Sequence, residues 1–390
     1  MRLVDRQRQL DALLPLFQPL WHPQPFREAR PAWCETWPAL AEELLFLDDE
    51  AAAALNGDSH AAGMLVARHV PEIAALLPLL ELPLPQLQSA SSVGERWAWE
   101  IPGRKRAQIE AFAASVQPGG RQVLDWCGGK GHLGRLLAHQ WQLPVRTLEI
   151  DKGLCRAGEQ LAQRLGVAQE FVAADALATD LRLAAGQHVV ALHACGELHR
   201  RLIRLGAEQG VAHFDVAPCC YHLHLQDEYL PLAAASSLRL SADDVRLAVT
   251  ETVTAGAREQ RQRDRAMAFK LGYAAWQMAV SGVSYRSFKP VPESWIRGSF
   301  GEFMALMCRR EGVVLPSAVY LERLERQGGE RQREVLRLSI VRHGFRRAIE
   351  LWLAGDLAVS LEERGYKVEL GTFCAREMTP RNLLISARLA

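Results

Sequence analysis

Between residues 121 and 219 the sequence alternates short apolar segments with helix-forming segments, and this alternation constrains the fold more than any other feature. The apolar segments are RQVLDWC, VRTLEID, QEFVAAD, HVVALHAC and VAHFDVAP. Apolar strands that alternate with helices form parallel sheets that are buried on both faces. Near the C-terminus, another helical segment precedes YKVELGTFC and NLLISARLA, which are close enough to pair as antiparallel strands. The sequence therefore predicts a doubly wound, Rossmann-like α/β fold whose seven-stranded sheet ends in an antiparallel C-terminal hairpin.

The rest of the chain has the pattern of helices. Residues 1–95 contain helical segments broken by Pro-rich joints, without strand alternation. After the fifth strand, SADDVRLAVTETV can begin a helix at Ser241, with Asp244 at the third position of a capping box. We therefore predict four parts, which are a helical N-terminal domain (1–95), the first part of the sheet domain (96–225), a helical basic insert (226–340) and the last helix and hairpin of the sheet domain (341–390).

Charge is unevenly distributed along the chain, although the net charge is only +1. Residues 1–95 hold six Arg against thirteen acidic residues, whereas residues 257–350 hold sixteen Arg and two Lys against ten acidic residues. A basic segment of this size is found in phosphate-binding proteins, and also on ordinary solvated helices. The charge pattern therefore permits a nucleic-acid partner without requiring one.

The N-terminal segment MRLVDRQRQL is charged where a signal peptide needs an apolar region. The longest apolar segments are interrupted by prolines and acidic residues, so we expect no membrane contact. Eight cysteines without C-x-x-C spacing are typical of reduced thiols rather than of a disulfide framework. We expect a cytoplasmic protein, and the sequence indicates no oligomeric state.

A glycine-rich segment, VLDWCGGKGHLG (residues 123–134), follows the first predicted strand and opens a helix. Its glycines let the backbone turn tightly and approach a ligand, and the start of the helix offers unpaired N–H groups. The spacing excludes a GxxxxGK[ST] phosphate loop, because Lys130 is followed by Gly131 rather than by Ser or Thr. The turn therefore predicts a ligand site of another kind.

Acidic residues end the next two predicted strands. The second strand ends in Glu149-Ile150-Asp151, where a carboxylate can accept hydrogen bonds from both hydroxyls of a ribose. Asp151 is our first choice for this role and Glu149 the second, and capping of the next helix is the alternative for Asp151. The third strand ends at Asp175, where a side chain can contact an adenine amino group, and a solvated loop aspartate is the alternative there.

These features in this order resemble the class I S-adenosylmethionine-dependent methyltransferases. VLDWCGGKGHLG, ALHACGEL, APCCYH and MTPRN are similar to motifs of one branch of that family. The branch contains the methyltransferase-like protein 25 group, the methyltransferase half of the glutathione S-transferase C-terminal domain-containing protein, and tRNA 2′-O-methyltransferases of the acceptor stem. The resemblance covers roughly residues 100–225 and 340–390.

The resemblance implies S-adenosyl-L-methionine as the cofactor. Cys127 stands where the usual class I pattern has its first glycine, and a side chain there narrows the pocket for the methionine part. The residues that we expect to contact the cofactor are Asp125, Cys127, Gly129, Gly131, His132, Glu149, Asp151, Asp175, Ala176, His193 and Cys195.

The fourth and fifth strands end in polar side chains that we expect to face the acceptor. Ligands of open parallel sheets bind at the carboxyl ends of the strands. The candidate catalytic residues at these ends are His193, Glu197, Cys219, Cys220, Tyr221 and His222. Among them His193, Glu197 and His222 are the candidates for proton removal.

Three interpretations of the cysteine pair at 219–220 remain open. We favour small packing residues beside the cofactor, because free cysteines are often buried. A cysteine nucleophile is a second interpretation, since D-x-x-P-C is similar to a motif of RNA cytosine-5 methyltransferases, although that motif belongs one strand earlier. The third interpretation is a metal site, whose ligands would come from Cys127, Cys195, Cys219, Cys220, His193 and His222. The favoured packing interpretation requires no metal.

The acceptor is predicted from the basic insert and from the resemblance. RNA, with tRNA favoured, is the first expectation. A protein acceptor is the alternative for an enzyme, and a cofactor-binding interaction module without catalysis is the alternative of another class. The motif of Asn or Asp, two prolines and an aromatic residue, which amino-group methyltransferases carry after the fourth strand, is absent from the sequence.

Overall fold

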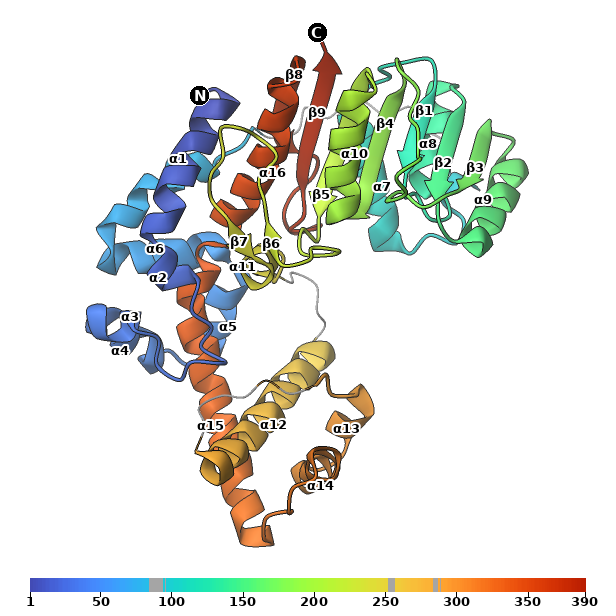
Figure 1. Cartoon of the computed structure of the whole chain (residues 1–390). Helices are drawn as coiled ribbons and strands as arrows, with labels where there is room; N and C mark the ends of the chain where they lie inside the picture. Colours follow the sequence, from blue (N-terminus) through green and yellow to red (C-terminus); the bar gives the residue numbers. More distant parts are fainter. Residues whose placement is uncertain (84–93, 95, 252–256, 283–286, 288) are drawn as a thin grey trace. The chain divides into compact units, whose positions relative to one another are not determined.

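A computed structural model of the chain describes residues 1–83, 94, 96–251, 257–282, 287 and 289–390 (Figure 1). The chain forms two compact units. The sheet unit comprises Met1–Leu16, Ala75–Val253 and Arg346–Ala390, and the helical unit comprises Phe17–Ala74 and Thr254–Phe345. The four-part division that the sequence suggested stays a prediction, and the two units are described separately below.

A seven-stranded sheet with the order β3-β2-β1-β4-β5-β9-β8 forms the centre of the sheet unit. The first five strands are parallel, and β9 is antiparallel to both of its neighbours, β5 and β8. This arrangement confirms the predicted α/β fold with its antiparallel C-terminal hairpin. The strands are β1 (Val123–Trp126), β2 (Val145–Glu149), β3 (Gln169–Ala173), β4 (His188–Cys195), β5 (His213–Cys219), β8 (Tyr366–Thr372) and β9 (Leu383–Leu389).

Helices cover both faces of this sheet, with α10 in front of it and α7 behind it in Figure 1. Every residue of β1 and β5 is buried, including the polar residues Asp125, His213 and Asp215. Helix α16 is the most deeply enclosed, since sixteen of its seventeen residues are buried. The helices of this unit are α1 (Leu3–Leu16), α7 (Gly103–Ser115), α8 (His132–Trp141), α9 (Lys152–Leu165), α10 (Glu197–Glu208) and α16 (Arg346–Glu362), with 3-10 turns η2 (Leu77–Leu80) and η3 (Arg96–Ala98).

Residues 220–251, which follow β5, belong to the sheet unit. They form a two-stranded ribbon of β6 (Glu228–Tyr229) and β7 (Leu240–Ser241), followed by α11 (Ala242–Leu247). The predicted capping box at the start of α11 is confirmed, because the side chains of Ser241 and Asp244 each accept the other's backbone N–H. The insert predicted as helical therefore begins with a short β ribbon.

The helical unit is built around two long helices, α12 (Ala257–Ser281) and α15 (Ala318–His343). They cross closely at Gly328, where an added Cβ would lie 2.3 Å from the carbonyl oxygen of Ala268. The core beside this crossing contains Phe269, Phe303 and Met307. The remaining helices are α2 (Gln18–Trp21), α3 (Trp33–Thr36), α4 (Pro38–Phe46), α5 (Asp49–Gly57), α6 (Ser59–His69), α13 (Glu293–Arg297) and α14 (Phe300–Glu311), and the 3-10 turn η1 (Pro71–Ala75) follows α6.

Within the described residues, no helix combines the length and apolar character needed to cross a membrane.

Candidate active site

The glycine-rich segment forms a tight turn between β1 and α8. Cys127, Gly129 and Gly131 have φ angles of 55°, 60° and 62°, so all three lie in the left-handed region. The N–H of Gly131 donates to the carbonyl of Gly128 at 2.9 Å, and α8 begins at the next residue. The predicted turn is therefore present, and it includes a cysteine in a backbone conformation that favours glycine.

Asp125 lies beneath this turn rather than beside an open surface. Its side chain is 1% exposed, and its Oδ2 accepts hydrogen bonds from the N–H of Gly134 at 3.1 Å and from Thr147 Oγ1 at 3.4 Å. An added Cβ on Gly128 would lie 2.3 Å from the same oxygen. Burial raises the pKa of Asp125 to about 6. Asp125 therefore stabilises the turn from its buried side.

His132, the first residue of α8, is also buried. Its Nδ1 lies 2.5 Å from the guanidinium of Arg135, which also donates to the carbonyl of Lys130. Burial, together with the charge of Arg135, lowers the pKa of His132 to about 3, so the imidazole is neutral and accepts this hydrogen bond. His132 thus stabilises the start of α8, and its Nδ1 is already hydrogen-bonded to Arg135.

A second carboxylate beside the turn belongs to Glu149, at the end of β2. Its Oε2 accepts the N–H of Gly129 at 2.9 Å, and its Oε1 accepts the N–H of Asp151 at 3.0 Å. Asp151 itself is exposed and caps α9, with its Oδ1 accepting the N–H groups of Gly153 at 2.6 Å and Leu154 at 3.1 Å. The capping alternative for Asp151 is thus observed, and Glu149 is the carboxylate that faces the glycine turn.

Asp175 follows the end of β3 and is exposed. One of its carboxylate oxygens accepts the N–H of Leu177 at 2.8 Å, which holds the side chain in a local turn. Ala176 beside it is buried. The second oxygen of Asp175 leaves room for the predicted contact with a ligand, and the solvated alternative also fits this exposure.

A bulge near the end of β4 changes which residues meet across β4 and β5. Leu192 is paired with Ala217, whereas Cys195 is paired with Cys219, so β4 contains one extra residue between these pairs. His193 lies at this irregularity with a φ of 72°, and its Nε2 is 3.2 Å from Oε1 of Gln108 on α7. Loss of hydration, helped by the charge of Lys105, lowers the pKa of His193. A neutral imidazole therefore stands at the end of β4.

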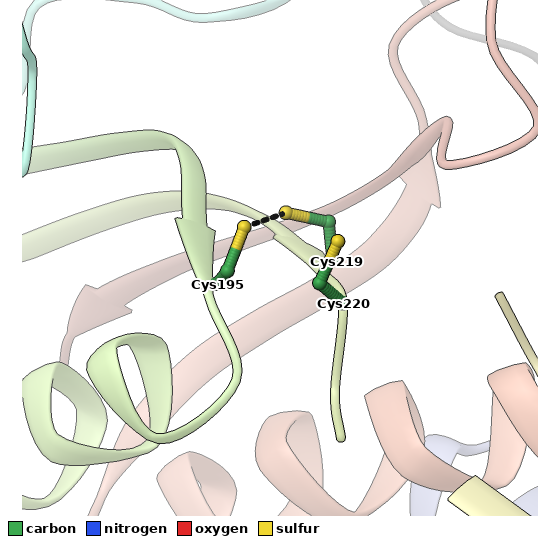
Figure 2. A group of neighbouring side chains, drawn as sticks. All are labelled: Cys195, Cys219 and Cys220. Carbon is green, nitrogen blue, oxygen red and sulfur yellow. Dashed lines mark hydrogen bonds between the residues drawn. The ribbon is translucent and has the colours of Figure 1, made fainter. Parts of the chain in front are cut away.

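Three cysteines converge where β4 and β5 end (Figure 2). The sulfurs of Cys195 and Cys219 are 3.3 Å apart, and those of Cys195, Cys219 and Cys220 all lie within 4.8 Å of one another. Hydrogen bonds from Cys195 and Cys219 lower the pKa of Cys220, and interaction with Cys195 raises that of Cys219. This thiol cluster (Cys195, Cys219, Cys220) thus favours one thiolate shared by three sulfurs.

Cys127 lies outside the thiol cluster. Burial raises its pKa to about 12, and the carboxylates of Glu149 and Asp125 add to this effect. Its thiol is therefore neutral and lies within the electrostatic reach of the predicted cofactor-binding acids. This environment is that of an inert wall residue rather than of a nucleophile.

The remaining predicted catalytic residues differ in how readily their side chains can accept a proton. Glu197 is held by Arg200 at 2.9 Å and by Arg204 at 2.5 Å, so its carboxylate is already neutralised. Tyr221 is fully buried, which raises its pKa far above the usual value. His222 is half-buried, and its Nδ1 has no hydrogen-bond partner among the described residues. His193 and His222 are therefore better placed than Glu197 or Tyr221 to accept a proton.

Two further residues beside the site, Arg381 and Gln108, are not among those predicted from the sequence. Arg381 lies in the MTPRN segment, donates to the carbonyls of Val249 and Glu251, and its charge lowers the pKa of Cys220. The MTPRN segment contributes to the family resemblance, but the sequence assigns no role to its individual residues. Gln108 lies on α7, where no pattern distinguished it from an ordinary helical residue.

A second buried polar group lies at the opposite edge of the sheet, where β4 and β5 begin. The rings of His188 and His213 stack with centroids 4.0 Å apart, and Asp215 Oδ2 is 2.8 Å from Nε2 of His188. Ser386 on β9 donates to the other oxygen of Asp215 at 2.5 Å. This group links three strands of the sheet and is separate from the ends that carry the thiol cluster.

Comparison with known protein families assigns this part of the chain. Residues 104–227 match the family model described as a methyltransferase domain, and they contain the glycine turn and the ends of all five parallel strands. These residues form a methyltransferase domain. The predicted enzyme class and its cofactor, S-adenosylmethionine, are confirmed for this domain.

One curated relative of the methyltransferase domain is a glutathione S-transferase C-terminal domain-containing protein homolog from Drosophila pseudoobscura pseudoobscura. It is 33% identical over 124 residues, which is 30% of this chain and 20% of the relative. The chain thus matches about one fifth of the length of this relative. The narrower resemblances, to the methyltransferase-like protein 25 group and to tRNA 2′-O-methyltransferases, stay predictions.

Two solved structures similar to the chain are methyltransferases with bound S-adenosyl-L-homocysteine. Magnesium protoporphyrin IX methyltransferase from Synechocystis PCC 6803 is 11% identical, with a TM-score of 0.33 over 77% of this chain and 95% of its own. The tRNA (uracil-54, C5)-methyltransferase from Pyrococcus abyssi is 19% identical, with a TM-score of 0.25 over 30% of this chain and 28% of its own. Both TM-scores are below 0.5, so the assignment depends on the family model and the strand order.

Proposed function

We propose that the chain transfers a methyl group from S-adenosylmethionine to an acceptor bound at the carboxyl ends of β1, β4 and β5. One observation carries this proposal. The glycine turn of the methyltransferase domain is hydrogen-bonded to the carboxylate of Glu149, and the imidazole of His193 and the thiol cluster stand at the ends of strands on the same edge of the sheet. Ligands of open parallel sheets bind at this edge.

The residues of the turn fit the cofactor. At Gly129 an added Cβ would meet nothing within 4 Å, so the backbone of the turn is open on that side. Glu149 lies beside the turn for the ribose hydroxyls, and Asp175 stands at the next strand end for the adenine. When bound, the cofactor supplies an electrophilic methyl group. The chain contributes by orienting the acceptor and by taking up its proton, which we assign to His193 or His222.

Replacing Glu149 by Ala is expected to weaken cofactor binding by about 30-fold, or roughly 2 kcal/mol, because a charged acceptor of hydroxyl hydrogen bonds is lost. The matched variant Asp151→Ala removes a carboxylate two residues away. It is expected to destabilise α9 by about 1 kcal/mol through loss of the cap and to leave the affinity nearly unchanged. Calorimetry and thermal unfolding measure the two effects. A larger loss of affinity in Asp151→Ala would return the ribose role to Asp151.

We propose RNA, with tRNA favoured, as the acceptor. The support is a row of exposed arginines along α12, of which Arg258, Arg261 and Arg265 are three. The charge of the whole helical unit limits this support. Its segment 254–345 holds sixteen basic and nine acidic residues, whereas its segment 17–74 holds three basic and nine acidic ones, so the unit carries a net charge of only +1.

Some of these opposite charges are paired within the helical unit. Arg30 binds Glu334 at 2.7 Å, and Arg337 binds Asp49 at 2.8 Å. RNA contact through this unit therefore depends on the local row on α12 rather than on the charge of the unit as a whole.

Reversal of the charge at three positions of this row, by Arg258→Glu, Arg261→Glu and Arg265→Glu combined, is expected to flatten the salt dependence of RNA binding. If three phosphate contacts are lost, the slope of log affinity against log salt should change by about 2, at roughly 0.7 per phosphate. Arg2→Glu, Arg8→Glu and Arg239→Glu together make the same change of charge on exposed positions of the sheet unit and serve as the control.

Labelled methyl transfer to RNA and protein fractions of cells that lack the gene distinguishes the alternatives. Label in RNA alone is the expected result. Label in protein alone would replace RNA by a protein acceptor. If neither fraction is labelled although the chain binds the cofactor, the result would support the alternative of an interaction module without catalysis.

A further inference from the structure

The thiol cluster has the dimensions of a metal site. Tetrahedral zinc, with zinc–sulfur bonds of about 2.3 Å, holds its sulfur ligands about 3.8 Å apart. The sulfurs of Cys195 and Cys219 are 3.3 Å apart, and all three sulfurs of the cluster lie within 4.8 Å of one another. Shifts of about 1 Å or less would therefore place the three sulfurs around one ion.

The backbone brings the sulfurs together by two local irregularities. The bulge in β4 sets Cys195 opposite Cys219, and side chains paired in neighbouring parallel strands point to the same face. Cys220 has a φ of 43°, a conformation that costs a residue with a side chain about 1 kcal/mol or more. Figure 2 shows that its sulfur lies beside those of Cys195 and Cys219. Ordinary packing of small apolar side chains requires neither irregularity.

We propose that Cys195, Cys219 and Cys220 bind a zinc ion through their three thiolates, and that the fourth coordination position is open. The proposal does not depend on methyl transfer, since a metal held by these side chains can be measured without any acceptor or cofactor. It replaces packing, which the sequence favoured for the cysteine pair, with metal coordination.

The positive charge near the thiol cluster and the partial exposure of its side chains are compatible with a bound zinc ion. Three thiolates with one Zn²⁺ carry a net charge of −1, and Arg381 lies close enough for its charge to stabilise an anion at Cys220. Cys219 is buried, whereas Cys195 and Cys220 are half-buried, which leaves a path for an ion. Soft thiolate ligands select zinc over magnesium or calcium.

The fourth position is the part of the site that the chain leaves open. In the part of the chain that the structure describes, no fourth His, Cys, Asp or Glu joins the group within 4.8 Å. Cys127, which the sequence had placed among the candidate ligands, is outside it. Zinc with three protein ligands keeps a position for water or for a ligand that it deprotonates. That position lies at the same strand ends as the proposed acceptor site.

Zinc content and thiol protection in the unaltered chain are the primary test. After reduction and removal of metal, the chain is expected to take up about one zinc per chain and to show thiolate-to-cobalt absorption when cobalt replaces zinc. Zinc should protect Cys195, Cys219 and Cys220 from alkylation, as located by peptide mass spectrometry. A chelator should reverse this protection. Because this test uses no variant, it does not depend on a substitution folding correctly.

Single serine variants identify the ligands. Cys195→Ser, Cys219→Ser and Cys220→Ser should each weaken zinc binding by more than about 100-fold, since loss of a mere supporting contact already costs 10- to 100-fold. Cys127→Ser should keep its zinc. Cys374→Ser introduces a buried hydroxyl elsewhere in the sheet unit and is the control for burial.

Three results would overturn the proposal. They are zinc uptake no higher than in the Cys195→Ser variant, equal alkylation of the cluster with and without zinc, and a Cys195–Cys219 disulfide that survives treatment with a thiol reductant. None of these results bears on methyl transfer, so failure of the metal site and failure of the proposed function are distinguishable.

Discussion

Gly129→Val is expected to reduce the affinity for S-adenosylmethionine by at least about 100-fold, which corresponds to roughly 2.7 kcal/mol. Gly129 has a φ of 60°, a region that a β-branched residue avoids at a cost of about 1–2 kcal/mol. Its N–H also donates to Glu149 Oε2 at 2.9 Å, so a change of φ would release this carboxylate from the turn. Finally, the added side chain would fill the open space that we assign to the cofactor.

The control for this variant is Gly365→Val. Gly365 precedes β8, has a φ of 87°, and an added Cβ there would also meet nothing within 4 Å. Both variants therefore introduce backbone strain at a position where the added Cβ itself meets no other atom of the chain. Thermal unfolding should show similar losses of stability, whereas calorimetry should show loss of cofactor binding only for Gly129→Val. Equal affinities in the two variants would mean that the turn does not hold the cofactor.

Asp356→Ala is expected to lower the free energy of unfolding by about 3–5 kcal/mol, because it leaves several buried donors without an acceptor. Asp356 on α16 is fully buried. Its carboxylate accepts Tyr229 Oη–H at 2.8 Å and the backbone N–H groups of Leu232 and Ala233, each at 2.9 Å. These bonds fix the loop between β6 and β7 on the central helix of the sheet unit.

Glu363→Ala provides a matched control at the end of the same helix. Glu363 accepts the N–H groups of Ala234 and Ala235, at 2.9 and 3.1 Å, from the same loop, but its side chain is exposed. Water can replace this carboxylate, so the loss should be within about 1 kcal/mol. Denaturant unfolding with both the midpoint and the slope recorded measures the difference. Equal losses would show that burial does not strengthen the contacts of Asp356.

The sheet was predictable because its signals are local. Five apolar segments, each too short for a helix and each followed by a turn, fix the strands, and parallel pairing follows from the helices between them. The capping box at Ser241 and the glycine turn were read correctly for the same reason, since a turn or cap depends on a few consecutive residues. For the ribose the sequence favoured Asp151 over Glu149, and no local signal could test that preference, because both residues end the same strand.

Contacts in the folded chain distinguish the two carboxylates. Glu149 meets the N–H of a residue twenty positions earlier, while Asp151 satisfies N–H groups two and three residues ahead. Glu197 differs, because its partners Arg200 and Arg204 lie three and seven residues later on the same helix, where helical spacing could have indicated the pairing. The limit of local signals does apply to the basic segment 257–350, whose charge is offset by acidic residues far away in the chain.

The α/β sheet and its C-terminal hairpin follow from the sequence alone, because periodicity and turn chemistry act over neighbouring residues. The meeting of Cys195 with Cys219 and Cys220, apart from Cys127, depends instead on how the strands pair in three dimensions. One extra residue in β4 shifts the register against β5 and turns a sulfur toward its neighbours. A bulge arises from pairing between strands, so no spacing within either strand could reveal it.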